Sequence, residues 1–167
     1  MNFRKWNSKK ILKELFIIAV LMFILSNIMS YLRQPELDST HLPKIEAKLL
    51  NGDMFHKKEG KPLLIHFWAV WCPTCKLEAA NIESVSKEYE VLTVAVSSGS
   101  DVGIKAYMQE HALNFKVIND VNGVWAKRFK VAAYPTTFMY DAKGELRFTE
   151  VGYTSTAGLL ARFEWVK

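Results

Sequence analysis

The chain opens with a long apolar stretch that differs from everything after it. Residues 15–32 carry no charged side chain, and two further apolar residues, Ile11 and Leu12, precede this run. A helix of about 20 apolar residues can cross a bilayer, and Lys13 and Arg33 can place their charged ends at the two surfaces. The pattern therefore predicts a transmembrane helix over residues 11–32, preceded by a basic segment at residues 1–10.

The charges beside this stretch predict its orientation. Basic residues cluster before the apolar run, and such a cluster keeps that end of a membrane helix in the cytoplasm. The alternative is a cleaved signal peptide, which has a shorter apolar region and a small-x-small cleavage site; residues 26–30 supply no good one. In both cases the rest of the chain is exported to a compartment where disulfides persist.

Beyond residue 33 the pattern changes to that of a mixed α/β domain over residues 44–167, after a polar, proline-containing linker at 33–43. Apolar runs of strand length alternate with helical periodicity, and a hairpin with an Asp-Ala-Lys-Gly turn follows. The expected strands are 63–69, 91–96, 115–118, 136–140 and 145–151, after a small hairpin at 45–56. The expected helices are 73–89, 101–111, 122–130 and 155–166. This order predicts a central mixed β-sheet with helices on both faces.

The helix expected at residues 73–89 has the clearest side-chain pattern. Leu77, Ile82, Val85 and Tyr89 are expected to face the core, and the Lys and Glu residues of the helix are expected to face mostly outward. The following helix is expected to be capped by Asp101 and to bury apolar residues on one side.

The net charge of +5 is unevenly distributed along the chain. Residues 1–32 hold five Lys or Arg and one acid, whereas residues 33–167 hold seventeen and sixteen. The predicted domain is thus close to neutral, and the basic excess belongs to the first segment. This distribution removes the compositional support for nucleic-acid binding.

The candidate chemistry lies in Trp71-Cys72-Pro73-Thr74-Cys75, which holds the two cysteines of the chain. The motif follows a predicted buried strand and opens a predicted helix, and Pro73 suits the first helical position. Cys72 then lies at the helix N-terminus, where free N–H groups and the helix dipole favour a thiolate. The pattern favours a dithiol/disulfide switch in which Cys72 attacks and Cys75, one turn further, resolves.

Three other interpretations of the cysteine pair are less favoured. A structural zinc site needs four ligands, and the sequence offers no second pair of Cys or His close by. A purely structural disulfide across so short a loop removes little entropy from the unfolded chain. A silent pair without function is the third interpretation, and the tryptophans and the strand-to-helix setting argue against it.

Two motifs carry a resemblance to a known family. Trp-Cys-Pro-Thr-Cys after the first central strand and Tyr-Pro-Thr-Thr before the hairpin resemble the thioredoxin superfamily, and the predicted anchor extends the likeness to the membrane-anchored TlpA/ResA/ScsD-type proteins. The resemblance covers about residues 43–167 and implies a thioredoxin-like fold. It implies Cys72 as nucleophile, Cys75 as resolving thiol and Pro135 as a cis-proline whose loop faces the disulfide.

The same resemblance suggests roles for the surrounding residues. Glu78 matches a glutamate near the active site, where a buried carboxylate could relay a proton to or from Cys75; an exposed helix glutamate is the alternative. The residues implied in substrate binding flank the cysteines and the proline: Trp71, Pro73, Thr74, Tyr134 and Thr136. Tyr134 is bulkier than the residue often found before that proline.

Two positions depart from the family pattern. His66 stands where thioredoxin has an acidic residue, and this histidine could tune the redox chemistry or be an ordinary core histidine. Thr136 stands where cytochrome c maturation reductants have a glutamate, which argues against that specialised role.

The sequence therefore predicts a thiol–disulfide oxidoreductase tethered to the outer face of the bacterial inner membrane, with its catalytic domain in the periplasm and no metal or organic cofactor. Its implied partners are cysteine-containing exported proteins and a membrane or periplasmic redox partner. A Cu(I)-binding chaperone that uses the same dithiol is the alternative, and a peroxidase of related fold is a third class. The direction of electron flow stays open.

Overall fold

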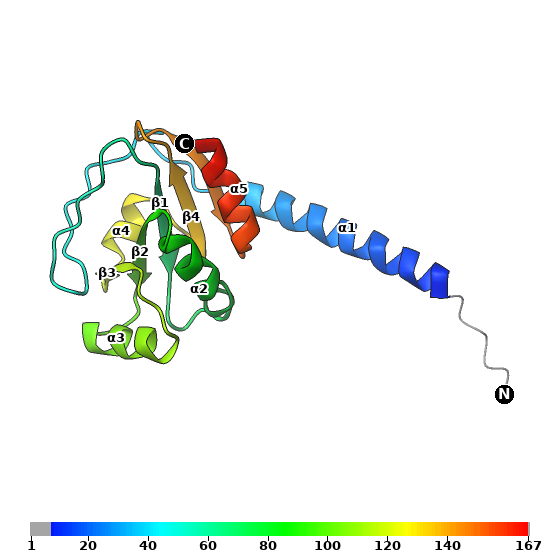
Figure 1. Cartoon of the computed structure of the whole chain (residues 1–167), viewed down its shortest axis with the longest axis horizontal. Coiled ribbons are helices and arrows are strands. Elements are labelled where there is room, and N and C mark those ends of the chain that lie inside the picture. The colour runs from blue at the N-terminus through cyan, green and yellow to red at the C-terminus, as the bar shows by residue number, and fades with distance from the viewer. Residues whose placement is uncertain (1–7, 167) are drawn as a thin grey trace. The chain divides into compact units, whose positions relative to one another are not determined.

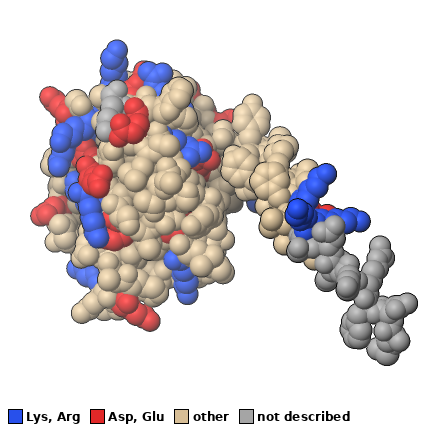
Figure 2. Space-filling model, turned by 45° about the vertical axis from the view of Figure 1, so that its right-hand side comes forward, with Lys and Arg blue, Asp and Glu red and all other residues tan. Residues whose placement is uncertain are grey.

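The structure is a computed structural model that describes residues 8–166. The chain divides into two compact units between Arg33 and Gln34. The first unit is helix α1 (Ser8–Leu32), and its segment from Lys9 to Leu32 is long and apolar enough to cross a membrane, with a mean hydropathy of 2.3. Figure 2 shows Lys and Arg gathered at the start of this helix and an uncharged surface after them.

The second unit is built around a five-stranded mixed sheet (Figure 1). Its strands are β1 (Leu63–Trp68), β2 (Glu90–Val96), β3 (Lys116–Asp120), β4 (Thr136–Tyr140) and β5 (Leu146–Val151), in the order β3-β2-β1-β4-β5. β1, β2 and β3 are parallel, whereas β4 is antiparallel to both β1 and β5. β1 lies in the centre with all its residues buried, which explains its nearly uninterrupted apolar sequence.

Helices cover both faces of this sheet, as predicted. Helices α2 (Pro73–Ser86), α3 (Asp101–Glu110) and α5 (Thr156–Val166) contribute to the core on one face. Helix α4 (Val124–Arg128) lies on the other face. Beside α4, three phenylalanine rings pack with their centroids 5.2 to 5.8 Å apart: Phe67, Phe129 and Phe138. The α/β fold with a mixed sheet is therefore confirmed.

The segment between Gln34 and β1 reaches both edges of the sheet. At the β5 edge the N–H of Leu146 donates to the carbonyl of Thr40 (2.8 Å), and at the β3 edge the N–H of Leu50 donates to the carbonyl of Val117 (2.8 Å). The same segment adds three buried residues to the core on the α4 face: Ala47, Leu49 and Phe55. Part of the predicted linker, residues 33–43, thus supplies main-chain hydrogen bonds to the sheet.

Some predicted boundaries and caps differ from the structure. Helix α2 ends at Ser86, three residues earlier than predicted, and Tyr89 follows it. Helix α3 is capped by Ser100 rather than Asp101, because the Ser100 hydroxyl accepts the N–H of Gly103 (3.2 Å). The hairpin expected at 45–56 is present only as a narrow turn closed by a single bridge between Lys48 and Met54.

The expected orientation of the α2 side chains is wrong for two residues. Leu77 was expected in the core and is 72% exposed, whereas Glu83, expected outside, is 8% exposed. Glu78, for which a buried and an exposed position were both open, is 0% exposed. Ile82 and Val85 are buried as expected. The glutamates lie inside because their carboxylates accept main-chain N–H groups of loops that follow other elements: Glu78 from Thr154, and Glu83 from Asn114 and Phe115.

Candidate active site

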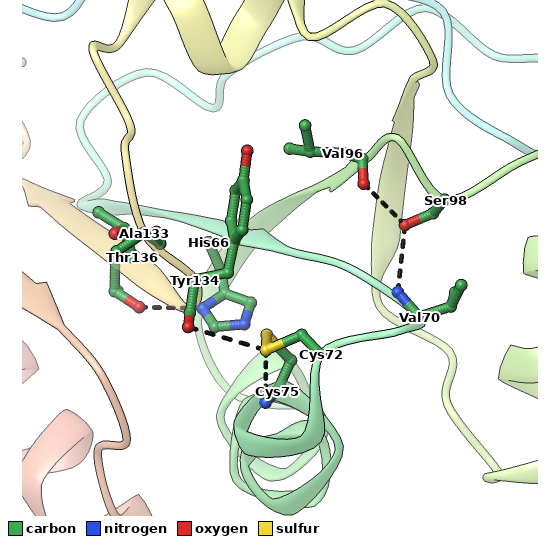
Figure 3. The surroundings of a disulfide bond; sticks show 10 residues. His66, Val70, Cys72, Cys75, Val96, Ser98, Ala133, Tyr134 and Thr136 are labelled. Atoms are coloured by element: carbon green, nitrogen blue, oxygen red, sulfur yellow. Dashed lines mark hydrogen bonds between the residues drawn. A yellow bond between two sulfur atoms is a disulfide. The ribbon is translucent and has the colours of Figure 1, made fainter.

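The two cysteines form a disulfide at the start of α2 (Figure 3). Cys72 is the N-cap residue with extended backbone angles, Pro73 occupies the first helical position, and the N–H of Cys75 points at Cys72 Sγ (3.2 Å). This contact places a main-chain donor where a Cys72 thiolate would carry its charge, which lowers a thiol pKa. Cys72 is slightly more exposed than Cys75, and both lie at the edge of the core.

A cis-proline loop faces the disulfide. The Tyr134–Pro135 peptide bond is cis, as the family resemblance implied, and the Tyr134 carbonyl oxygen lies 3.7 Å from Cys72 Sγ. An oxidised sulfur has no proton to donate, so this contact becomes a hydrogen bond only when Cys72 is a thiol. Thr136 is buried, and its hydroxyl donates to the carbonyl of Ala133 (2.8 Å), which fixes the loop before β4 (Figure 3).

Aromatic side chains form one rim of the site. Trp71 is 57% exposed, and its ring lies edge to face with that of Tyr134, with centroids 5.8 Å apart. The indole N–H of Trp71 donates to the carbonyl of Ser97 (3.1 Å), and the N–H of Val70 donates to the Ser98 hydroxyl (3.1 Å). The loop after β2 thus holds the residues before Cys72 in place. These two serines were not among the predicted site residues, because their only signal in the sequence is their position after a parallel strand beside β1.

Glu78 lies in the core one turn after Cys75. One of its oxygens accepts the N–H of Thr154 (3.2 Å), and the other is buried and has no partner among the described residues. Burial, which outweighs the lowering effect of the Thr154 hydrogen bond and is supported by the charge of Glu150, raises the pKa of Glu78 to about 8. The side chain therefore carries a proton at neutral pH. Of the two positions that the sequence left open for Glu78, a buried carboxyl group and an exposed helix glutamate, the structure contains the buried one.

His66 lies in β1 on the same sheet face as α2. Its Nδ1 is 2.9 Å from the hydroxyl of Thr137 on the neighbouring β4. Burial lowers the pKa of His66 to about 3, because it disfavours the charged form of the ring. The imidazole is neutral, so both buried titratable groups at this site are uncharged near pH 7.

The remaining predicted site residues lie at the surface of the motif. Pro73 is exposed and Thr74 is half-buried, so both can contact a partner. Within residues 8–166, no group of three or more His, Cys, Asp or Glu side chains is arranged to hold a metal ion. A Cys-x-x-Cys pair at a helix start, faced by a cis-proline on a mixed sheet, defines a thioredoxin-like thiol–disulfide oxidoreductase.

Comparison with known proteins places the chain within that class. The model of the AhpC/TSA family matches residues 39–149, well over half of the chain, and the protein belongs to this family. It is 30% identical over 158 residues to a thioredoxin-like protein of Haemophilus influenzae, a match that covers 92% of this chain and 93% of that protein. It is 27% identical over 128 residues to sporulation thiol-disulfide oxidoreductase A of Bacillus subtilis, covering 72% and 75% of the two chains.

Solved structures show the same likeness. A secreted disulfide oxidoreductase of Mycobacterium tuberculosis, homologous to E. coli DsbE, superposes with a TM-score of 0.64 at 26% identity and covers 72% of this chain and 95% of its own. The protein is accordingly a thiol–disulfide oxidoreductase with a thioredoxin-like fold.

Proposed function

We propose that this oxidoreductase exchanges disulfides with exported proteins through Cys72 and Cys75 while α1 holds it to the outer face of the bacterial inner membrane. The observation that carries the proposal is the position of Cys72, which caps α2 and faces the cis-proline loop. Cys72 is the sulfur that a partner reaches first, and Cys75, more deeply placed, resolves the mixed disulfide.

The exchange is a two-electron transfer. A partner thiolate attacks Cys72 Sγ, the Cys72–Cys75 bond breaks, and its electron pair stays on Cys75, which takes up a proton. The second thiol of the partner then loses its proton and attacks the partner's sulfur in the mixed disulfide, so that Cys72 leaves as a thiolate. The partner is oxidised and the protein is reduced; the reverse sequence reduces a partner disulfide.

Glu78 supports proton handling at Cys75 in this proposal. A spacing of three residues places the two side chains next to each other on the inner side of α2. Because Glu78 is protonated at neutral pH, it can give its proton to the Cys75 thiolate that forms when the disulfide is opened, and it can take the proton back on reoxidation. Neutral His66 would leave this exchange undisturbed by a second charge.

The membrane placement rests on α1 and on the basic residues at its start. Lys9, Lys10 and Lys13 lie at the end of α1 that precedes the apolar run, which favours a cytoplasmic N-terminus and a periplasmic catalytic unit. Protease treatment of intact spheroplasts tests this topology: the catalytic unit should be digested from outside, whereas without protease the full-length chain should be recovered in the membrane fraction. Recovery of a shortened chain in the soluble fraction would indicate a cleaved signal peptide instead.

The reduction potential of the cysteine pair is the experiment that tests the function. The protein is equilibrated with mixtures of reduced and oxidised glutathione, and free thiols are trapped and counted. A potential near about −270 mV, like that of thioredoxin, would make the protein a reductant, and one near about −120 mV, like that of DsbA, an oxidant. A pair that cannot be cycled by glutathione at all would overturn the proposal. Cys72→Ser should abolish exchange, and Cys75→Ser should accumulate the mixed disulfide.

A further inference from the structure

The solvent side of α2 beside the disulfide is unusually apolar for an exposed helix. The helix has three charged residues, and two of them, Glu78 and Glu83, are turned into the core. Its exposed residues are Pro73, Lys76, Leu77, Ala80 and Ser84, of which only Lys76 is charged. A surface helix normally shows the opposite arrangement, with charged residues outside and apolar ones inside.

The most exposed apolar residue of this surface has an aromatic neighbour. Leu77 is 72% exposed, and Asn81 follows it by four residues, which places the two side chains on the same side of α2. The Asn81 amide donates to the hydroxyl of Tyr153 (3.1 Å) and to the carbonyl of Thr154 (3.0 Å), so the 54% exposed Tyr153 is fixed against the helix at this point. We refer to the exposed side chains of Leu77 and Tyr153 together as the α2 face.

The position of the α2 face relative to Cys72 is set by helix geometry. Leu77 follows Cys72 by five residues, which places it about 7.5 Å further along the helix axis and roughly 140° around that axis. A partner in the mixed disulfide has its sulfur bonded to Cys72 at about 2 Å, and an extended chain advances about 3.3 Å per residue. The residues two or three positions from the partner's cysteine can therefore reach Leu77.

We propose that the α2 face is a docking surface for the segment that flanks the target cysteine, and that it selects partners with a large apolar side chain two or three positions from that cysteine. The proposal rests on the proposed function, because the covalent intermediate at Cys72 is what brings the segment to this place. Continuity with the reacting sulfur favours a polypeptide partner over a second copy of the chain or a lipid surface. Contact with Leu77 and Tyr153 removes apolar surface from water on both sides.

The test measures an exchange equilibrium at Cys72 in the full chain held in lipid nanodiscs. In the Cys75→Ser background, Cys72 is first joined to glutathione. A peptide thiol then displaces glutathione, so that one disulfide breaks, one forms, and reduced glutathione is released. Two seven-residue peptides with a central cysteine are compared, one with leucine two positions before and three positions after it and one with serine there. Mass spectrometry after acid quenching gives the two equilibrium constants.

The expected result is a preference of about tenfold for the leucine peptide, because burial of one leucine-sized side chain changes an equilibrium constant by about that factor. Leu77→Gln should reduce this preference to about twofold, whereas Leu77→Met, which stays apolar, should keep it. The matched control is Trp165→Gln. Trp165 is 84% exposed and lies beside Asp141 and Lys143 of the β4–β5 turn, at the opposite end of the sheet, and its replacement should leave the preference unchanged.

The outcomes separate this proposal from the function on which it rests. If Cys72 forms no mixed disulfide with glutathione or either peptide, the proposed function fails. If exchange proceeds but the preference is absent, or is equally reduced by Leu77→Gln and Trp165→Gln, the docking proposal is overturned and the function stands. The preference for the leucine peptide could instead survive in Leu77→Gln. If that substitution then converts a dimer into monomers, the α2 face binds a second copy of the chain; if it weakens binding to lipid, the face binds the membrane.

Discussion

Replacing Glu78 by glutamine tests whether this carboxyl group is held uncharged in the core. Glutamine has nearly the same shape, can still accept the N–H of Thr154, and cannot ionise. Protonated glutamate and glutamine both leave one polar group without a protein partner at this place, so the two proteins should have similar stability in acid.

The difference between the two proteins should then grow with pH in a defined direction. The pKa of Glu78 is raised from 4.5 to about 8 in the folded protein. Between these two values the unfolded chain has released its proton and the folded chain has not, so the folded state binds more protons and loses stability as the pH rises. The difference between the two pKa values corresponds to about 5 kcal/mol of unfolding free energy. By pH 8 the Glu78→Gln protein should therefore be more stable than the unmodified protein by about this amount.

The assay is guanidinium unfolding of the oxidised fragment 34–167, which forms a compact unit, at half-unit steps from pH 4 to pH 9. The free-energy difference between Glu78→Gln and the unmodified fragment should be near zero at pH 4, rise through neutral pH and level off above about pH 8. Contributions from titrating groups that do not interact with Glu78 cancel in this difference. If the unfolding free energies of the two fragments showed the same dependence on pH, the reasoning would be refuted, because Glu78 would then ionise in the folded protein as it does in the unfolded chain.

Further predictions concern the contacts that build the site, each measured by guanidinium unfolding of the same fragment. Glu83→Ala leaves one buried and one part-buried main-chain N–H group without this acceptor and should cost about 1–3 kcal/mol, whereas Glu83→Gln, which keeps an acceptor, should cost clearly less. Thr137→Val removes the partner of the buried His66 ring and should cost about 1–3 kcal/mol; an unchanged midpoint would mean that the imidazole finds another partner. Phe129→Ala opens a cavity between Phe67 and Phe138 and should cost about 3–5 kcal/mol, and a loss below about 1 kcal/mol would contradict the packing described beside α4.

The sequence predicts the fold well because most of its signals are local. The strands are short apolar runs, the Asp141–Gly144 turn separates β4 from β5, and Pro73 marks the start of α2. The cysteine spacing marks one side of the site, and the resemblance to the thioredoxin superfamily, carried in part by the Tyr-Pro-Thr-Thr motif, implied that Pro135 faces it. These features depend on residues close together in the chain, which a single sequence displays directly.

The missed features depend on contacts between distant parts of the chain. Glu83 is turned inward by N–H groups 31 and 32 residues later, and Glu78 by one that is 76 residues later. An expectation based on charge places both glutamates in water and, in consequence, rotates Leu77 into the core. The hydrogen bonds of Ser97 and Ser98 to the residues before Cys72 are likewise invisible in a linear pattern, since they join two neighbouring loops at one end of the sheet.

The segment before β1 also bears on how the protein avoids self-association. Strands at the edge of a sheet offer unpaired main-chain groups to other molecules and can start aggregation. Here one stretch of chain bonds to β5 through Thr40 and to β3 through Leu50, so each outer strand is partly occupied by the protein's own backbone. A soluble fragment that began only at residue 57 would keep the cysteines and the cis-proline but would present two bare strands to its neighbours. The polar, proline-containing stretch that was predicted as a linker is thus part of a segment that also covers the edges of the sheet.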